Sequence, residues 1–193
     1  MKTIVWDVDD VLNDLMREWF EQAWMPAHPG CTVAYADISE NPPHQVLQVP
    51  LAEYLQSLDA FRERSIPGLF PVPEVRAWFE RHGERFRHVA LTAVPLCAAH
   101  LSAEWVIRHY GTWMRSFNFV PSLRDDKVLP GYDQTKSDFL RWLDRADVFV
   151  DDSQANVQGA RDLGIQALLM PRPWNSSGMT VAATLEQLSG LKG

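Results

Sequence analysis

Short apolar runs that end on acidic or hydroxyl residues recur along this chain, and they constrain its fold more than any other feature. The first run, Thr3–Trp6, ends on Asp7, and helical periodicity begins a few residues later. A second run at 88–91 ends on Thr92, and a third, within 147–153, ends on a pair of adjacent acids. Runs of this length and composition predict short, buried β-strands.

Amphipathic segments separate these runs. Apolar residues spaced by three or four positions predict helices between the strands. The alternation of strands and helices predicts βαβ units and therefore an α/β fold with a parallel sheet. The predicted strands cover 3–6, 88–91, 117–120, 147–151 and 166–169, and the predicted helices cover 14–24, 51–64, 74–82, 96–110, 137–145, 154–163 and 182–191.

Composition restricts the class of protein. With 193 residues, 46% hydrophobic and 22% charged, the chain can bury one substantial core. A net charge of −7 argues against a surface for nucleic-acid polymers or membranes. Two cysteines, Cys31 and Cys97, favour a reducing compartment. No signal peptide or membrane-length apolar run is recognisable, so we expect a cytoplasmic protein.

Acidic residues gather at the predicted strand ends. Asp7, Asp9 and Asp10 follow the first strand, and Asp151 and Asp152 follow the strand within 147–153. Ligands of open α/β sheets bind beyond the carboxyl ends of the strands, and hard carboxylate oxygens suit Mg²⁺. The alternative is that these acids only form turns and cap the next helices.

The order of these motifs resembles the haloacid dehalogenase-like (HAD) hydrolase superfamily over nearly the whole chain. The resemblance implies a Rossmann-like, doubly wound parallel sheet with a small helical cap inserted after the first strand. The core domain would comprise 1–13 and 66–193, and the cap 14–65. The motifs that carry the resemblance are Asp7-x-Asp9, Thr92, Lys136 and the pair Asp151 and Asp152.

The resemblance also implies catalytic and metal-binding roles. Asp7 would be the nucleophile that forms an aspartyl-phosphate, and Asp9 would protonate the leaving group and then activate water. Mg²⁺ would be held by Asp7, by the backbone carbonyl of Asp9 and by Asp151, with Asp152 in support. We therefore expect a Mg²⁺-dependent phosphatase that acts on a small-molecule phosphate ester.

The resemblance also implies phosphate-binding residues, in the first acidic segment and in two further segments. Thr92, the backbone N–H groups of Asp10 and Ala93, and the ammonium group of Lys136 would contact the phosphate. Lys127 is a rival for the phosphate lysine. A cation at a helix N-terminus, as at Lys136, is locally unfavourable, which favours a functional role.

Several fragments resemble the 5'(3')-deoxyribonucleotidase branch of this superfamily. In that branch, cap aromatics stack on the base of a nucleoside monophosphate. Candidate substrate residues are Trp19, Phe20, Trp24 and Lys127. Asp10 departs from the branch, which usually has Gly at this position, and 130–147 reads as an insertion. The fragments are 66–70, 104–111, 124–127 and 172–175.

Other functions remain open. A sugar or other metabolite phosphatase of the same superfamily is the nearest alternative, and a non-catalytic protein that binds a phosphate ligand is another. A response-regulator receiver also combines acids, a hydroxyl and a lysine. There, however, the acid pair follows the first strand and the Asp that accepts phosphate follows a central one, whereas here Asp-x-Asp comes first, a second acid pair comes late and a cap-sized insertion intervenes. A dehalogenase proper would not need Asp9. We expect a monomer or homodimer.

Overall fold

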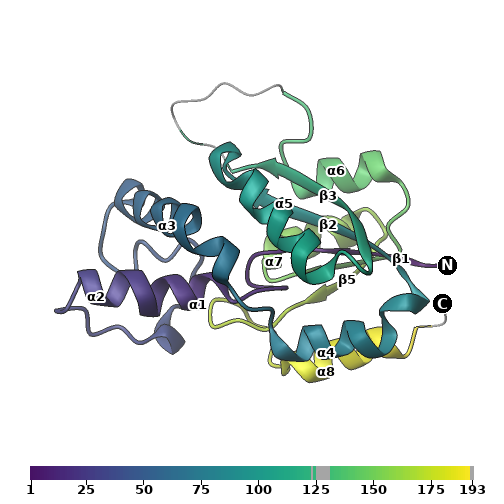
Figure 1. Ribbon diagram of the computed structural model, residues 1–193, viewed down its shortest axis with the longest axis horizontal. Helices are drawn as coiled ribbons and strands as arrows, with labels where there is room; N and C mark the ends of the chain where they lie inside the picture. Colours follow the sequence, from purple (N-terminus) through teal and green to yellow (C-terminus); the bar gives the residue numbers. More distant parts are fainter. Residues whose placement is uncertain (123, 125–130, 192–193) are drawn as a thin grey trace.

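A computed structural model of the chain describes residues 1–122, 124 and 131–191 and contains one all-parallel, five-stranded sheet (Figure 1). The strand order is β3-β2-β1-β4-β5, which confirms the predicted α/β class. The strands are β1 (Thr3–Trp6), β2 (Arg87–Val94), β3 (Met114–Pro121), β4 (Val148–Asp151) and β5 (Gln166–Leu169).

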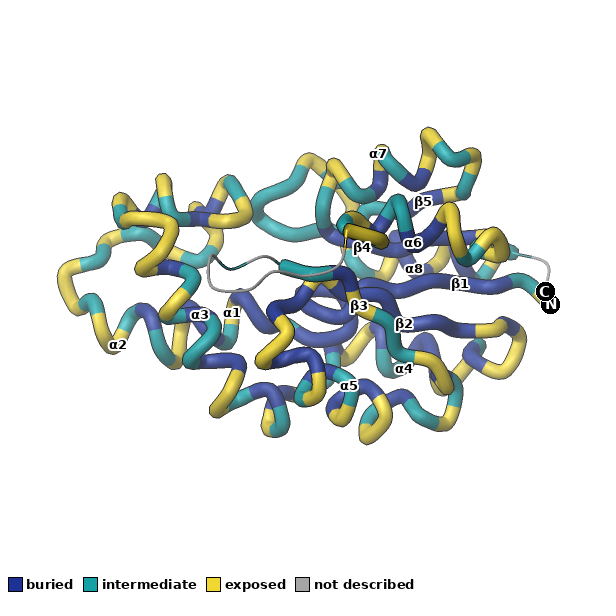
Figure 2. Tube along the Cα trace, turned by 90° about the horizontal axis from the view of Figure 1, so that it is seen from above, coloured by how far each residue is buried: buried dark blue, intermediate teal, exposed yellow. Residues whose placement is uncertain are grey.

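The first strand of the chain lies at the centre of the sheet. Trp6 of β1 pairs with Ala90 of β2 on one side and with Val150 of β4 on the other. All four residues of β1 are buried, and this strand is dark blue along its length in Figure 2. Because these three strands are parallel and adjacent, the residues that follow them lie at the same edge of the sheet.

Helices cover both faces of the sheet. Val5 points into a core formed with α6 (Lys136–Leu143) and α7 (Gln154–Asp162). Trp6 points into a larger core on the opposite face, as the two-residue period of a strand requires. The helices on that face are α4 (Pro73–His82), α5 (Leu96–Tyr110) and α8 (Val181–Ser189).

The segment between β1 and α4 forms the helical end of the molecule, at the left of Figure 1. It is mostly helical, as predicted, although one turn at Phe20–Trp24 is a π-helix. Residues 31–50 contain only short turns and one 3-10 turn. The elements are α1 (Leu15–Trp19), η1 (Phe20–Trp24), α2 (Met25–Ala27), η2 (Tyr35–Asp37), α3 (Leu51–Ser65) and η3 (Ile66–Gly68).

The chain leaves and re-enters the sheet domain at one place. Asn13 and Pro71 form an isolated antiparallel bridge, and the Val72 N–H donates to the Leu12 carbonyl at 2.9 Å. The segment between these points is therefore inserted like a long loop that closes on itself. We retain the division into a core and a cap at 14–65 as a proposal.

Two strands are longer than predicted. β2 continues through Thr92 to Val94, and β3 begins at Met114 instead of 117. The polar residues His88 and Thr92 stand at the two ends of the apolar run in the sequence, yet both are buried in the sheet.

Within the described residues, none of the helices combines the length and apolar character needed to cross a lipid bilayer.

Candidate active site

A cavity of about 560 Å³ lies beyond the carboxyl ends of the three central strands. The end of β1 contributes Asp7 and Asp9, β2 contributes Thr92 and Ala93, and the loop after β4 contributes Asp152. The sequence motifs thus meet because the sheet places these strand ends side by side. Thr92 is buried and Ala93 is exposed to the cavity side of the strand end.

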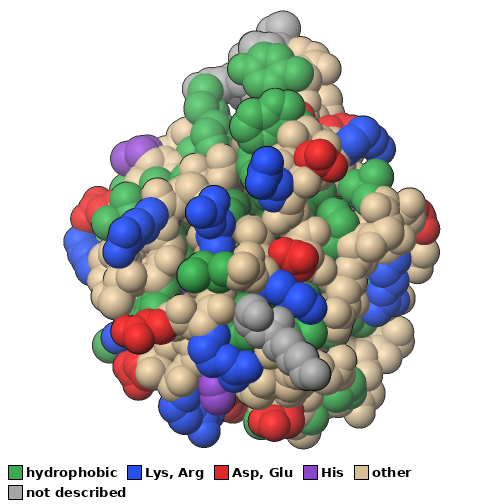
Figure 3. Space-filling model, turned by 90° about the vertical axis from the view of Figure 1, so that its right-hand side faces the viewer, with side chains coloured by type: hydrophobic (Ala, Val, Ile, Leu, Met, Phe, Trp, Pro, Cys, Tyr) green, Lys and Arg blue, Asp and Glu red, His purple; other side chains and the backbone are tan. Residues whose placement is uncertain are grey.

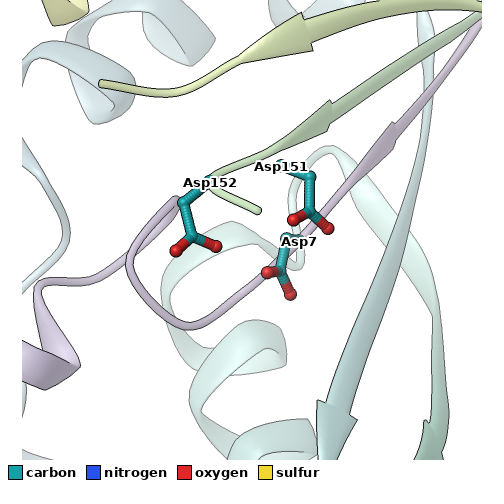
Figure 4. Close-up of side chains that lie close together, drawn as sticks. All are labelled: Asp7, Asp151 and Asp152. Atoms are coloured by element: carbon teal, nitrogen blue, oxygen red, sulfur yellow. The ribbon is translucent and has the colours of Figure 1, made fainter. Parts of the chain in front are cut away.

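Three carboxylates converge at this edge of the sheet. Asp7 from the end of β1 and Asp151 and Asp152 from the end of β4 each place an oxygen within 4.8 Å of the other two (Figure 4). All three side chains are buried. Three buried carboxylates are an unstable arrangement unless cations neutralise them, and oxygen ligands of this kind suit Mg²⁺.

Lys136 supplies one of these cations. Its Nζ lies 2.7 Å from Asp7 Oδ2 and 2.7 Å from Asp151 Oδ2, and its side chain is only 3% exposed. The helix α6 that carries it begins at a capping box, in which Thr135 and Asp138 satisfy each other's backbone N–H groups. The cap places Lys136 at the first helical residue, directed at the acids.

The single positive charge of Lys136 does not neutralise three carboxylates. Burial raises the pKa of Asp7 well above its ordinary value, Lys136 opposes this, and Asp151 and Asp152 add to it. Burial, with Asp151 next, raises the pKa of Asp152 to about 7. Burial alone would lower the pKa of Lys136, but Asp151 and Asp7 more than reverse this. The donor set therefore suits a divalent cation held by Asp7, Asp151 and Asp152.

Asp9 lines the same cavity but makes a different set of contacts. Its Oδ1 accepts from Asn13 Nδ2 at 3.4 Å, and its Oδ2 accepts from Arg62 NH2 at 3.2 Å. Arg62 comes from α3 in the inserted segment and is buried. Arg62 could not be predicted from the sequence, because an arginine three residues after Asp59 on a helix is typical of a surface ion pair.

Solved structures with the same architecture are HAD-like hydrolases. A predicted phosphatase from Clostridium acetobutylicum superposes with a TM-score of 0.64 and 14% identity, covering 98% of this chain and 99% of that one. The chain has the fold of HAD-like hydrolases. A haloacid dehalogenase-like family hydrolase from Streptococcus pneumoniae gives a TM-score of 0.58 at 15% identity, with 97% and 90% of the two chains covered.

A third structure, a HAD-superfamily hydrolase of subfamily IA from Geobacter sulfurreducens, gives a TM-score of 0.53 at 15% identity and covers 97% of this chain and 96% of that one. No family model matches the sequence, and no curated protein matches it. At these identities the similarity defines the HAD-like fold, and the chemistry has to be argued from the site.

Asp10 shapes the loop after β1 in this HAD-like fold. Its backbone has φ 60°, a left-handed conformation that favours glycine, which is the residue that the nucleotidase branch usually has at this position. Its side chain accepts from the Met16 N–H at 2.9 Å, and its own N–H donates to Asn13 Oδ1 at 3.3 Å. Burial raises the pKa of Asp10 to about 7, and Arg172 opposes this. A phosphate at the Asp10 N–H would replace the long bond to Asn13.

The loop after β5 donates hydrogen bonds to the acidic loops that follow β1 and β4. Arg172 Nε donates to the Asp10 carbonyl at 2.7 Å, and Trp174 Nε1 donates to Asp152 Oδ2 at 2.7 Å. Asn175 Nδ2 donates to the Asp152 carbonyl at 2.8 Å. The fragment 172–175 carries the resemblance to one branch of the superfamily, but its contacts with the acids were not predicted. Such contacts orient metal ligands from behind.

The three aromatic residues predicted to contact the substrate are not brought to the cavity. Trp19, Phe20 and Trp24 are at most 3% exposed and pack in the core of the inserted segment, with Trp19 and Trp24 ring centroids 5.3 Å apart. They do not line the cavity, because the apolar face of this helix is used for packing. The aromatic residues that line it are Tyr54 and Trp174. Lys127 lies outside the described residues.

Proposed function

We propose that this protein is a Mg²⁺-dependent phosphohydrolase that cleaves a small phosphomonoester through an aspartyl-phosphate on Asp7. The observation that carries the proposal is a buried group of charged side chains at the carboxyl ends of β1 and β4, beside a cavity that Asp9 also lines. The group consists of Asp7, Lys136, Asp151 and Asp152. A structural ion-pair cluster would not need three carboxylates around one lysine beside a cavity.

The first step is attack of an Asp7 carboxylate oxygen on phosphorus. Asp7 is held for this by the Val8 N–H, which donates to Oδ1 at 2.7 Å, and by Lys136 at Oδ2. The P–O bond to the leaving group breaks, and Asp9 gives its proton to the departing oxygen. The carbon part of the ester leaves as an alcohol, and the phosphoryl group remains on Asp7.

The second step regenerates the enzyme. Asp9, now a carboxylate, takes a proton from water, and the water oxygen attacks phosphorus and displaces the Asp7 carboxylate as inorganic phosphate forms. Thr92 and the Ala93 N–H would bind phosphate oxygens, while Lys136 balances their charge. Mg²⁺, bound by Asp7, Asp151 and Asp152 with the Asp9 carbonyl, would offset the repulsion between carboxylate and phosphate.

The inserted segment would act as the cap over this chemistry. Residues of α1 and α3 line the cavity together with the strand-end residues, so closure of this segment would exclude bulk water. Among substrates we place a nucleoside monophosphate first, with the nucleoside as leaving group, because Trp174 offers a half-buried aromatic surface at the cavity. A sugar or other metabolite phosphate is the second candidate. A cytoplasmic monomer or homodimer completes the proposal.

The proposal is tested by phosphate release from deoxynucleoside and ribonucleoside monophosphates, sugar phosphates and a generic aryl phosphate. Each is assayed with Mg²⁺, with EDTA, and with Asp7→Asn protein as the blank. Metal-dependent release that disappears in Asp7→Asn protein supports the phosphatase, and the ranking of esters tests the nucleotide assignment. A folded Asp7→Asn variant that keeps full activity would show that the nucleophile is wrong.

Asp9→Asn separates the acid from the metal site. Because only the Asp9 backbone is assigned to the metal, this variant should lose turnover by on the order of 100-fold or more and keep its Mg²⁺ affinity in calorimetric titration. A large loss of Mg²⁺ affinity with turnover preserved would contradict the assignment.

A further inference from the structure

An arginine from the cap touches the proposed acid. Arg62 of α3 lies 3.2 Å from Asp9 Oδ2 through NH2 and 3.1 Å from Asp59 Oδ1 through NH1. The side chain is 9% exposed and lines the cavity. Because Asp9 faces the leaving group in the proposed reaction, Arg62 lies beside the leaving group as well.

A second arginine fixes this arrangement. Arg124 Nε donates to Asp59 Oδ2 at 2.7 Å, and Arg124 NH2 donates to Asp59 Oδ1 at 2.8 Å. Paired parallel bonds of this kind hold a carboxylate in one orientation. Asp59 is therefore held from two sides, and the guanidinium plane of Arg62 is set by Asp59 at one nitrogen and Asp9 at another.

The third nitrogen of Arg62 has no acceptor. Arg62 Nε is buried, and no described residue accepts its N–H. An unsatisfied buried donor costs about 1–3 kcal/mol, more when the group is charged. The side chains that α1 and α3 otherwise place on the cavity carry no carboxylate or amide oxygen, and the Tyr54 hydroxyl does not accept this N–H: Leu15, Met16, Tyr54, Leu55 and Leu58.

We propose that Arg62 is a specificity residue whose Nε–H donates to an oxygen of the leaving group, close to the ester oxygen that receives the proton of Asp9. The preferred substrates are phosphomonoesters whose leaving group carries a hydroxyl or carboxylate oxygen near the ester bond. An unsubstituted alkyl group would leave the buried donor unpaired, which disfavours binding and transition state alike. The inference rests on the proposed phosphatase function.

The test compares esters of matched length: n-propyl phosphate, 2-hydroxypropyl phosphate and the phosphate ester of 3-hydroxypropanoate. Phosphate release is measured for the wild-type protein, Arg62→Lys, Arg62→Gln and the control Arg64→Lys. Arg64 is exposed on the same helix and does not line the cavity. An aryl phosphate with Asp7→Asn as blank reports the basic reaction independently of this preference.

In wild-type protein, kcat/KM should be at least ~10-fold higher for one oxygen-bearing ester than for propyl phosphate. The hydroxyl and carboxylate esters distinguish the two sources of the oxygen. Both Arg62 variants should bring that ratio toward one, because neither lysine nor glutamine reproduces the third donor of a fork held at Asp9 and Asp59. Arg64→Lys should leave the ratio as it is in wild type.

Equal losses for all esters in the Arg62 variants, with the ratio intact, would mean that Arg62 acts only by positioning Asp9, and the inference would be wrong. A wild-type protein without preference between the esters would overturn it even if the variants did not fold. If the aryl phosphate itself shows no release that depends on Asp7, the proposed function fails, which is a separate result.

Discussion

The two ends of the sheet carry charged residues in very different environments. At the carboxyl end, Asp7, Lys136 and Asp151 are no more than 5% exposed. At the amino end, Arg87 and Arg115 lie at the starts of β2 and β3 and are exposed. Figure 3 looks onto that end and shows basic and acidic side chains spread over the surface.

The two groups of charged residues differ in what their positions cost in free energy. An exposed arginine keeps its hydration, and its position requires no special arrangement around it. A buried carboxylate loses its hydration, so Asp7, Asp151 and Lys136 must hold one another, and apolar residues of similar volume would often stabilise the fold as well. Among the residues that the structure describes, the buried aspartates, Lys136 and Arg62 all lie at the carboxyl end of the sheet, around the cavity.

The largest effect is expected at the lysine. In Lys136→Met protein, Asp7 and Asp151 lose their shared cation, so kcat should fall on the order of 100-fold or more. The free energy of unfolding without metal should fall by about 3 kcal/mol, because buried carboxylates are left unpaired. Assay and urea denaturation measure the two effects. Lys127→Met is the matched control, and loss of activity there instead would make Lys127 the phosphate lysine.

An effect of intermediate size is expected one contact further from the cavity. Trp174→Phe removes the donor to Asp152 Oδ2 but keeps an aromatic ring. Mg²⁺ affinity should weaken by about 10- to 100-fold, with a smaller change in kcat at saturating Mg²⁺. Calorimetric titration provides the affinity, and Trp142→Phe, at a residue 70% exposed on α6, serves as control. Unchanged affinity in Trp174→Phe would remove this loop from the metal site.

A buried histidine near the amino end of the sheet is expected to affect the pH dependence of stability and not activity. His88 accepts from Trp6 Nε1 at 3.0 Å and contacts the Gly83 carbonyl at 2.8 Å, and burial lowers its pKa to about 4. As pH falls, the His88 imidazole therefore binds a proton near pH 6.5 in the unfolded chain but only near pH 4 in the folded protein. This lowers the free energy of unfolding as pH falls through that interval, by up to about 3 kcal/mol.

His88→Gln isolates this effect. Asp10 and Asp152, whose pKa values burial raises to about 7, change stability in the opposite direction over the same interval, so wild type alone is not informative. Urea denaturation at several pH values should show the wild-type protein losing stability relative to His88→Gln below about pH 6.5, with activity above that pH similar. A constant difference across this range would refute a neutral, buried His88.

The smallest effect is expected at the exposed arginines. Arg87→Gln and Arg115→Gln should change the free energy of unfolding by no more than about 0.5 kcal/mol and leave turnover unchanged, since both side chains are solvated at the end away from the cavity. Loss of activity in either variant would show that charge at the amino end of the sheet also matters for function.

The sequence predicted the strand-end residues better than those on the cap. Asp7, Thr92 and Asp151 could be found because each ends or follows an apolar run, and parallel strands bring such ends together whatever the helices do. The position of Lys136 followed in the same way from its place at a helix start. These are local features, which a sequence contains directly.

The cap side of the cavity could not be predicted, because it depends on how helices pack. Asp59 and Arg62 look like an ordinary surface pair on α3, and only tertiary packing turns them toward Asp9. Conversely, Trp19 and Trp24 looked available for a ligand but fill the core of the inserted segment. The left-handed backbone of Asp10 was not predicted, although the Gly usual at this position in the nucleotidase branch was a signal for it.

The most direct test of the account is to find the phosphoryl group on the protein. The Mg²⁺-loaded protein is mixed with its best substrate from the ester panel, quenched in acid within a single turnover, digested and mapped by mass spectrometry. The account predicts a phosphorylated peptide with the modification on Asp7, absent in EDTA and in Asp7→Asn protein. Turnover without any phosphorylated carboxylate, or with the phosphoryl group on another residue, would contradict it.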